Sequence, residues 1–202
     1  GYLYAGMGWT TVNEAAVPIL SAKHTHEELH DTPIVDKSCL VLMANNEIVL
    51  DLIEAGEIER ARHVVAWLIW AAKVYGIKPV NPGGVAAWKW GKNARRLHDP
   101  IEGYQTLTPG QIISALADII DELGLPHPLH LHCNNLGNPG KISTTLETMK
   151  VLEGRRADLG GQGVRREGGQ PRRARQLEVR PEREHALRAG RRLPEGHAGA
   201  DH

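Results

Sequence analysis

Apolar runs of strand length alternate with amphipathic stretches of helix length along the first 153 residues, and this alternation limits the possible folds more than any other feature. Buried strands are predicted at 10–12, 39–43, 77–80 and 129–133. Helices are predicted at 46–55, 57–74, 108–123 and 144–152. Strands that alternate with helices build a parallel sheet, so an α/β protein is predicted, with either an open doubly wound sheet or part of a (β/α)8 barrel. A whole barrel typically needs about 250 residues, so about four βα units would make half of one.

Local signals refine the ends of these elements. Thr108 with Gln111 three residues later matches a capping box, and Thr144 with Glu147 matches a second one. Pro79 falls inside the third predicted strand, where a proline cannot donate a hydrogen bond to a neighbouring strand. Pro79 therefore weakens the prediction of that strand.

The composition changes abruptly after residue 153. Residues 1–153 carry 8 Lys, 4 Arg and 17 acidic residues, whereas residues 154–202 carry no Lys, 12 Arg and 7 acidic residues. The Arg- and Gly-rich tail has too little apolar surface to offset the entropy of ordering it, so it is predicted to be disordered. Three interpretations stay open: a basic tail that meets an acidic partner, a weak surface helix at 183–192, and sequence read out of frame.

The global features exclude several classes of protein. The formal net charge of zero argues against a dedicated nucleic-acid-binding protein. The sequence contains no apolar run of 18 residues and no secretory leader, so a membrane protein is not expected. Two cysteines, Cys39 and Cys133, are too few for a disulfide framework and indicate a reducing compartment. A cytoplasmic protein that binds neither membranes nor nucleic acid is predicted.

Two histidines lie two residues apart in the last predicted strand. His130 and His132 would point to one face of that strand, and the apolar residues beside them to the other. Imidazoles inside a parallel sheet are costly unless they are hydrogen-bonded or bound to a metal, and both interpretations stay open. Asn134 and Asn135 follow at the strand end, the edge that carries active sites in barrels, and are candidates for substrate binding.

Lys78 lies within an otherwise apolar strand, just before a Gly- and Pro-rich loop. A buried lysine either loses its charge or acquires a partner. Carbamylation by carbon dioxide would remove the charge and create an anionic oxygen ligand able to bridge two metals. The alternative is a lysine whose stem packs while its amine reaches solvent.

Two further clusters contain residues suited to binding. The run at residues 23–31 is rich in His and acidic residues, but no apolar strand precedes it, so an exposed helix turn or loop is predicted. Trp88, Trp90, Lys89 and Lys92 could line a pocket for an anionic or elongated substrate, or form a packed lid. The sequence contains no G-x-G-x-x-G or P-loop pattern, which argues against dinucleotide and nucleotide binding.

Several stretches taken together resemble one family. The stretch GWTTV at residues 8–12, the strand lysine Lys78 and the histidines at 130–135 match the pattern of the amidohydrolase superfamily of metal-dependent hydrolases. More specifically, the chain is similar to the A subunits of formylmethanofuran dehydrogenase and of the related formyltransferase/hydrolase complex of methylotrophic bacteria. The similarity covers about residues 1–157 and is carried by HTHEELHDTP, VNPGGVAAWKWGKN, LTPGQII, LGLPHPLHLHCNNLG and TTLETM.

The resemblance implies a fold, a site and a reaction. Residues 1–157 would form about four βα units of an amidohydrolase-type (β/α)8 barrel, and residues 158–202 a low-complexity tail. A complete site would hold two zinc ions bridged by a carboxylated Lys78, with His132, or His130 in its place, as a further ligand. The enzyme would interconvert formate plus methanofuran, the one-carbon carrier, with N-formylmethanofuran, in a complex with other subunits.

The chain also departs from the family pattern. The family's first H-x-H would precede Gly1, and neither its strand-six histidine nor its strand-eight aspartate has a counterpart. No catalytic residue is therefore assigned, and we expect a fragment that does not catalyse alone and leaves an open sheet edge. Two alternatives stay open: another amidohydrolase acting on a cyclic amide such as a hydantoin, and a non-catalytic interaction protein with a basic tail.

Overall fold

The computed structural model describes residues 1–84, 96–136, 139–159 and 162–163. The chain divides into two units, Gly1–Gly169 and Gln170–His202, and every described residue belongs to the first. The loop that holds the Trp88 and Trp90 cluster lies outside the described residues, and so does the tail from residue 164 onward.

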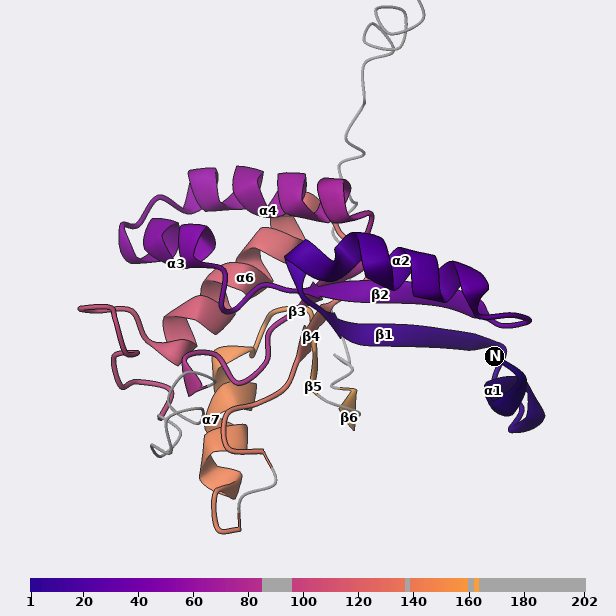
Figure 1. Ribbon diagram of the computed structural model, residues 1–202. Helices are drawn as coiled ribbons and strands as arrows, with labels where there is room; N and C mark the ends of the chain where they lie inside the picture. Colours follow the sequence, from indigo (N-terminus) through magenta and orange to yellow (C-terminus); the bar gives the residue numbers. More distant parts are fainter. Residues whose placement is uncertain (85–95, 137–138, 160–161, 164–202) are drawn as a thin grey trace, which may run out of the picture. The chain divides into compact units, whose positions relative to one another are not determined.

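Strands and helices alternate along the described part of the chain, as the sequence predicts (Figure 1). In chain order the elements are α1 Tyr2–Gly6, β1 Thr11–Val17, η1 Ile19–Ser21, α2 Ala22–Asp31, β2 Asp36–Leu42, α3 Glu47–Glu54, α4 Ile58–Ala72, β3 Gly76–Lys78, α6 Pro109–Leu123, β4 Leu129–Leu131, α7 Ile142–Val151, β5 Ala157–Leu159 and β6 Gln162–Gly163. Helix α1 and strands β5 and β6 are not among the elements that the sequence predicts.

The strands form two groups that meet at one point. Strands β1, β2 and β3 pair in parallel, β4 pairs in parallel with β5, and β6 is antiparallel to β5. A parallel bridge between Val80 and His132 joins β3 to β4. The N–H of His132 donates to the carbonyl of Pro79 (3.0 Å), and the N–H of Asn81 donates to the carbonyl of His132 (2.9 Å). In a regular ladder of this register the N–H of residue 79 would donate to the carbonyl of His130, and a proline has no N–H, so the ladder is interrupted there.

The order of the strands decides between the two predicted architectures. Each parallel strand lies beside the one that precedes it in the sequence. A doubly wound sheet reverses direction at a switch point, whereas a (β/α)8 barrel adds each strand next to the last. The described residues therefore form part of a (β/α)8-type barrel and not a doubly wound sheet, one of the two architectures that the sequence analysis predicts.

One face of the sheet packs against the helices. Val41 of β2, Ile77 of β3 and Leu131 of β4 are fully buried on this face. Helix α6 contributes the side that its sequence pattern predicts, with Ile112, Ile113, Leu116, Ile119 and Ile120 buried. Because successive strand residues point to opposite faces, the other face of the sheet receives Lys78, His130 and His132.

Of the two predicted capping boxes, the first is confirmed and the second is wrong. The hydroxyl of Thr108 accepts the N–H of Gln111 (3.3 Å), and the Gln111 side chain accepts the N–H of Thr108 (2.8 Å). Helix α7 begins at Ile142, so Thr144 lies inside the first turn and cannot act as the N-cap. Its hydroxyl instead accepts a hydrogen bond from the Asn135 amide (3.4 Å).

The confirmed capping box gives a stability prediction. Thr108→Ala should lower the free energy of unfolding by about 1 kcal/mol, because the N–H of Gln111 in the first turn of α6 loses its acceptor. Thr108→Ser keeps the hydroxyl and should stay close to wild type. Urea unfolding of the three proteins checks this, and equal midpoints for the Ala and Ser variants would contradict it.

Candidate functional site

Lys78 ends β3 and is the one charged residue that is buried in the described part of the chain, with 7% of its surface exposed. It lies in register with Leu42 of β2, and its carbonyl accepts the N–H of Met43 (3.3 Å). Burial disfavours the ammonium form of a lysine.

His132 lies on the neighbouring strand, close enough to Lys78 for the two charges to interact. Desolvation lowers the pKa of the His132 imidazole, and the positive charge of Lys78 lowers it further. A lowered pKa keeps the ring neutral at neutral pH, and a neutral imidazole is the form that binds metals. The structure therefore brings together two of the predicted site residues, Lys78 and His132.

His130 lies two residues nearer the amino end of β4 and pairs in register with Asp158 of β5. Its ring centroid is 5.9 Å from that of His127, which in turn lies edge-on to Tyr75 at 5.7 Å. His130 is half-buried among these rings. His130 lies on the same strand face as His132, but its ring packs beside the ring of His127.

The two asparagines after β4 point to different partners. Asn134 is fully buried, and its Nδ2 donates to the carbonyl of Pro82 (2.8 Å), which follows β3. Asn135 has a positive φ of 59° and donates through Nδ2 to the Thr144 hydroxyl of α7. Asn134 thus connects the ends of β3 and β4, whereas Asn135 connects β4 to a helix.

Two of these residues, His130 and His132, are of a type that binds zinc. Catalytic zinc takes three protein ligands and a water, drawn from His, Cys, Asp or Glu. In the described ranges no group of three or more such side chains is placed to hold a metal ion. Lys78, His130 and His132 offer nitrogen atoms, and a carbamylated Lys78 would add oxygen ligands.

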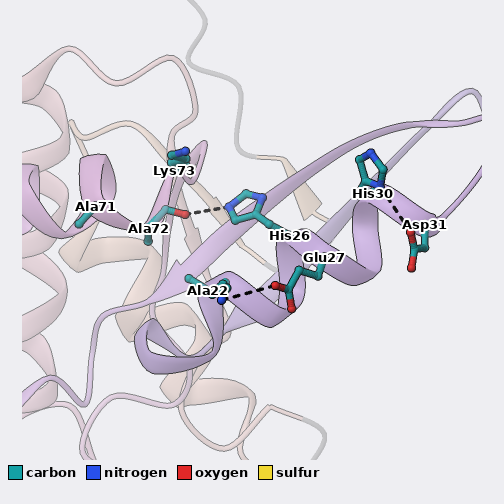
Figure 2. Close-up of a pocket in the computed structure, with 9 residues that line it drawn as sticks. Ala22, His26, Glu27, His30, Asp31, Ala71, Ala72 and Lys73 are labelled. Carbon is teal, nitrogen blue, oxygen red and sulfur yellow. Dashed lines mark hydrogen bonds and ion pairs between the residues drawn. The ribbon is translucent and has the colours of Figure 1, made fainter.

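The His-rich run at residues 23–31 forms most of α2, where the sequence analysis predicts an exposed helix turn or loop. Figure 2 shows the groove between α2 and the end of α4, with His26 directed at the carbonyl of Ala72. The distance from His26 Nε2 to this oxygen is 2.8 Å. A carbonyl only accepts, so Nε2 carries the proton and satisfies one of the unpaired carbonyls at the end of α4.

Glu54, at the end of α3, holds the segment that leads from β3 to α6. Its Oε1 accepts the backbone N–H groups of Gln105 (2.8 Å), Thr106 (2.8 Å) and Leu107 (3.2 Å). These hydrogen bonds, that of Thr106 foremost, lower the pKa of the Glu54 carboxyl below its ordinary value. The sequence carries no signal for this contact, because the partners are main-chain groups more than 50 residues away.

The barrel segment with a buried lysine beside a strand-end histidine is the arrangement that the resemblance to the amidohydrolases implies. Residues 1–171 match the amidohydrolase family, and the chain belongs to this family. It is 52% identical to protein FwdA of Methanocaldococcus jannaschii over 154 residues, which are 76% of this chain and 27% of FwdA. It is 41% identical over 157 residues to the A subunit of the formyltransferase/hydrolase complex Fhc of Methylorubrum extorquens, a match that covers 77% of this chain and 28% of that relative.

A solved structure supports the same relationship. The structure of the complex FhcABCD from Methylorubrum extorquens with methylofuran matches with a TM-score of 0.73 and 40% identity, over 77% of this chain and 29% of the other. The resemblance to these A subunits is therefore confirmed. The chain spans less than a third of the length of the relatives it matches.

The helices of the described residues are too short or too polar to span a membrane. Among these residues, no helix is both long enough and apolar enough to cross one. This agrees with the absence of an apolar run of that length in the sequence.

The contact between α2 and α4 gives a second stability prediction. His26→Ala should lower the free energy of unfolding by about 1 kcal/mol, because the Ala72 carbonyl loses its donor. His30→Ala on the same helix is the control, since the His30 side chain is 89% exposed. Thermal unfolding of both variants checks this, and an equal loss in both would contradict it.

Glu54 gives a prediction of pH dependence. Because the folded-state pKa of Glu54 is lowered, its contacts stabilise the protein at neutral pH and are lost as the pH falls through that value. The difference in urea midpoint between wild type and Glu54→Gln should therefore be largest at neutral pH and shrink in acid. Glu153→Gln, at an exposed position, is the control. A difference for Glu54→Gln that does not change with pH would contradict the prediction.

Proposed function

We propose that this chain forms part of the amidohydrolase-type subunit of an enzyme that interconverts formate plus methanofuran with N-formylmethanofuran. The observation that carries the proposal is the buried Lys78 beside His132 on neighbouring parallel strands. The similarity to FwdA and to the Fhc relative supports it. The methylofuran in the related complex supports an amine carrier of this kind as the small-molecule substrate.

Lys78 and His132 have separate roles in this proposal. Lys78 would react with carbon dioxide through its side-chain amine to give the bridging carboxylated lysine, at a buried position of β3. The lowered pKa of His132 favours a neutral ring that ligates one of two zinc ions, with His130 as the competing ligand. When bound, zinc would polarise the formyl oxygen and activate a water molecule.

Asn134 and Asn135 are proposed to bind the substrate, because both follow β4 at the edge of the sheet that carries Lys78 and His132. The Nδ2 of Asn135 donates one hydrogen bond to Thr144, which leaves its second N–H and its side-chain oxygen to contact the substrate. Asn134 is fully buried and is the more constrained of the two.

The complete enzyme needs more metal ligands than the described residues supply. The described donors leave zinc coordination incomplete, so we assign the remaining ligands and the strand-eight aspartate to parts of the relatives that this chain does not match. By itself the chain would be inactive. The matches over 154 and 157 residues support residues 1–157 as the family domain and 158–202 as a separate tail.

Two further features of the complete protein belong to the proposal. Other subunits would assemble with it, a proposal that the composition of the related complex FhcABCD supports. A cytoplasmic location follows from the low cysteine content, because a protein in an oxidising compartment more often carries a disulfide framework.

Zinc content tests the proposal. The full-length protein should bind about two zinc ions per molecule, and Lys78→Ala should lose them because the bridging ligand is removed. Lys141→Ala, at an exposed position, is the matched control. Elemental analysis measures the metal, and an unchanged zinc content in Lys78→Ala would count against the proposal.

A second assay separates this function from the hydrolysis of cyclic amides. The rate at which the full-length enzyme converts N-formylmethanofuran is compared with its rate on a hydantoin.

A further inference from the structure

Helix α4 carries two exposed tryptophans on the side that faces away from the core. Its inner side is buried through a stripe made of Ala61, Val65, Leu68 and Ala72. Trp67 and Trp70 project from the opposite side of the helix, and their exposed fractions are 61% and 76%. Residues three apart on a helix are neighbours on its surface, so the two indoles form one apolar patch. Exposed apolar patches of this kind mark interaction sites.

The wall of the barrel does not cover these tryptophans. In a (β/α)8 barrel each helix lies between the helices of the preceding and the following unit, and for α4 these are the described helices α2 and α6. Helix α2 contacts α4 where His26 donates to the Ala72 carbonyl (2.8 Å). Helix α6 contacts α4 where Arg62 Nε lies 3.5 Å from the Glu122 carboxylate. Since both neighbours are in place, a cover must come from outside the ring of barrel helices.

A hollow of about 530 Å³ lies beside Trp70, over the last turn of α4. Its lining is mainly apolar and comes from Ala66, Ile69, Trp70, Ala71, Lys73 and Val74. An apolar side chain from a partner would fit this hollow and pack against the indole. We call the surface made of Trp67, Trp70, Lys73 and this hollow the tryptophan face.

Lys73 adds a positive charge at one end of the tryptophan face. It ends α4 with a positive φ of 52°, and Figure 2 shows it beyond Ala71 and Ala72. Its amine forms no ion pair with a carboxylate in the part of the chain that the structure describes. A partner that brings a carboxylate to this point would therefore be complementary in charge.

The charges at the other end of α4 argue against a second copy of this chain as the partner. Glu57 is already paired with Arg60. Glu59 is already paired with Arg62. Two copies docked through the same face would present the same side chains to each other, so α4 would bring no free carboxylate to Lys73. A polypeptide of different sequence is the better complement.

We propose that the tryptophan face is the docking surface for another subunit of the enzyme complex, through a segment that places an apolar side chain in the hollow and a carboxylate on Lys73. This inference rests on the proposed function and identifies the surface that the assembly uses. The composition of the related complex FhcABCD supports a partner of different sequence. Tryptophan is also among the residues most enriched at the energetic centres of protein interfaces.

Hydroxyl-radical footprinting measures the cover directly. The full-length subunit is oxidised briefly, once in isolation and once in the assembled complex, and mass spectrometry measures the modification of Trp67 and Trp70. Both indoles should react in the isolated subunit and lose most of this reactivity in the complex. The comparison uses the whole protein, so any cover that the rest of the same chain supplies is already present in the isolated subunit.

Substitutions at the face test its contribution to affinity. The double variant Trp67→Gln, Trp70→Gln should keep its zinc content and melting temperature, because both positions are exposed, but bind the other subunits at least about tenfold more weakly. Lys73→Asn tolerates the positive φ and removes the charge, so it should weaken binding at low salt and have less effect at high salt. Lys150→Asn, at an exposed position of α7, is the matched control.

The outcomes are distinguishable. An unchanged affinity in the double variant, with both indoles as reactive in the complex as in isolation, overturns the inference. Protection that is already present in the isolated subunit overturns it as well, and assigns the face to the rest of the same chain if that subunit is a monomer or to a second copy if it is a dimer. An assembled wild-type complex that holds no zinc and does not convert N-formylmethanofuran instead overturns the proposed function.

Discussion

The candidate site depends on the pairing of β3 with β4. This pairing consists of a single parallel bridge between Val80 and His132, because Pro79 removes the next bond of the ladder. The bridge brings Lys78 and His132 to one edge of the sheet, where the charge of the lysine acts on the imidazole. The hydrogen bond from Asn134 to Pro82 joins the same two strand ends beyond the bridge. A side chain thus reinforces the strand ends where the main-chain ladder is weakest.

Much of the fold could be predicted because its elements are marked locally. The apolar stripe of α6 and its capping box at Thr108 are both visible in the sequence, and both are present in the structure. Strand β5 was not predicted, because Ala157 to Leu159 is too short and too weakly apolar to stand out. The false capping box at Thr144 shows the converse limit. Thr144 and Glu147 have the residue types of a capping box, but helix α7 already begins at Ile142, two residues before Thr144. Residue types at the right spacing therefore do not by themselves locate the start of a helix.

The site could be predicted where it follows from strand periodicity. Alternation predicts that His130 and His132 share a face, and an apolar surrounding predicts that Lys78 is buried, as it is. The proximity of Lys78 to His132 could not be predicted, because it depends on the register between β3 and β4, which the sequence does not specify. The same holds for the hydrogen bond from Asn134 to the Pro82 carbonyl, because it joins residues 52 positions apart in the sequence.

Glu54 illustrates how one carboxylate can leave a loop open to evolutionary change. It holds the segment before α6 mainly through backbone N–H groups, which every residue except proline possesses. These backbone hydrogen bonds do not depend on the identity of the side chains, whereas Tyr104 adds a side-chain hydrogen bond to Asp51 of α3. Substitutions at the exposed Gln105 and Thr106 would leave these backbone hydrogen bonds in place, so this part of the loop can change in sequence while it keeps one anchor.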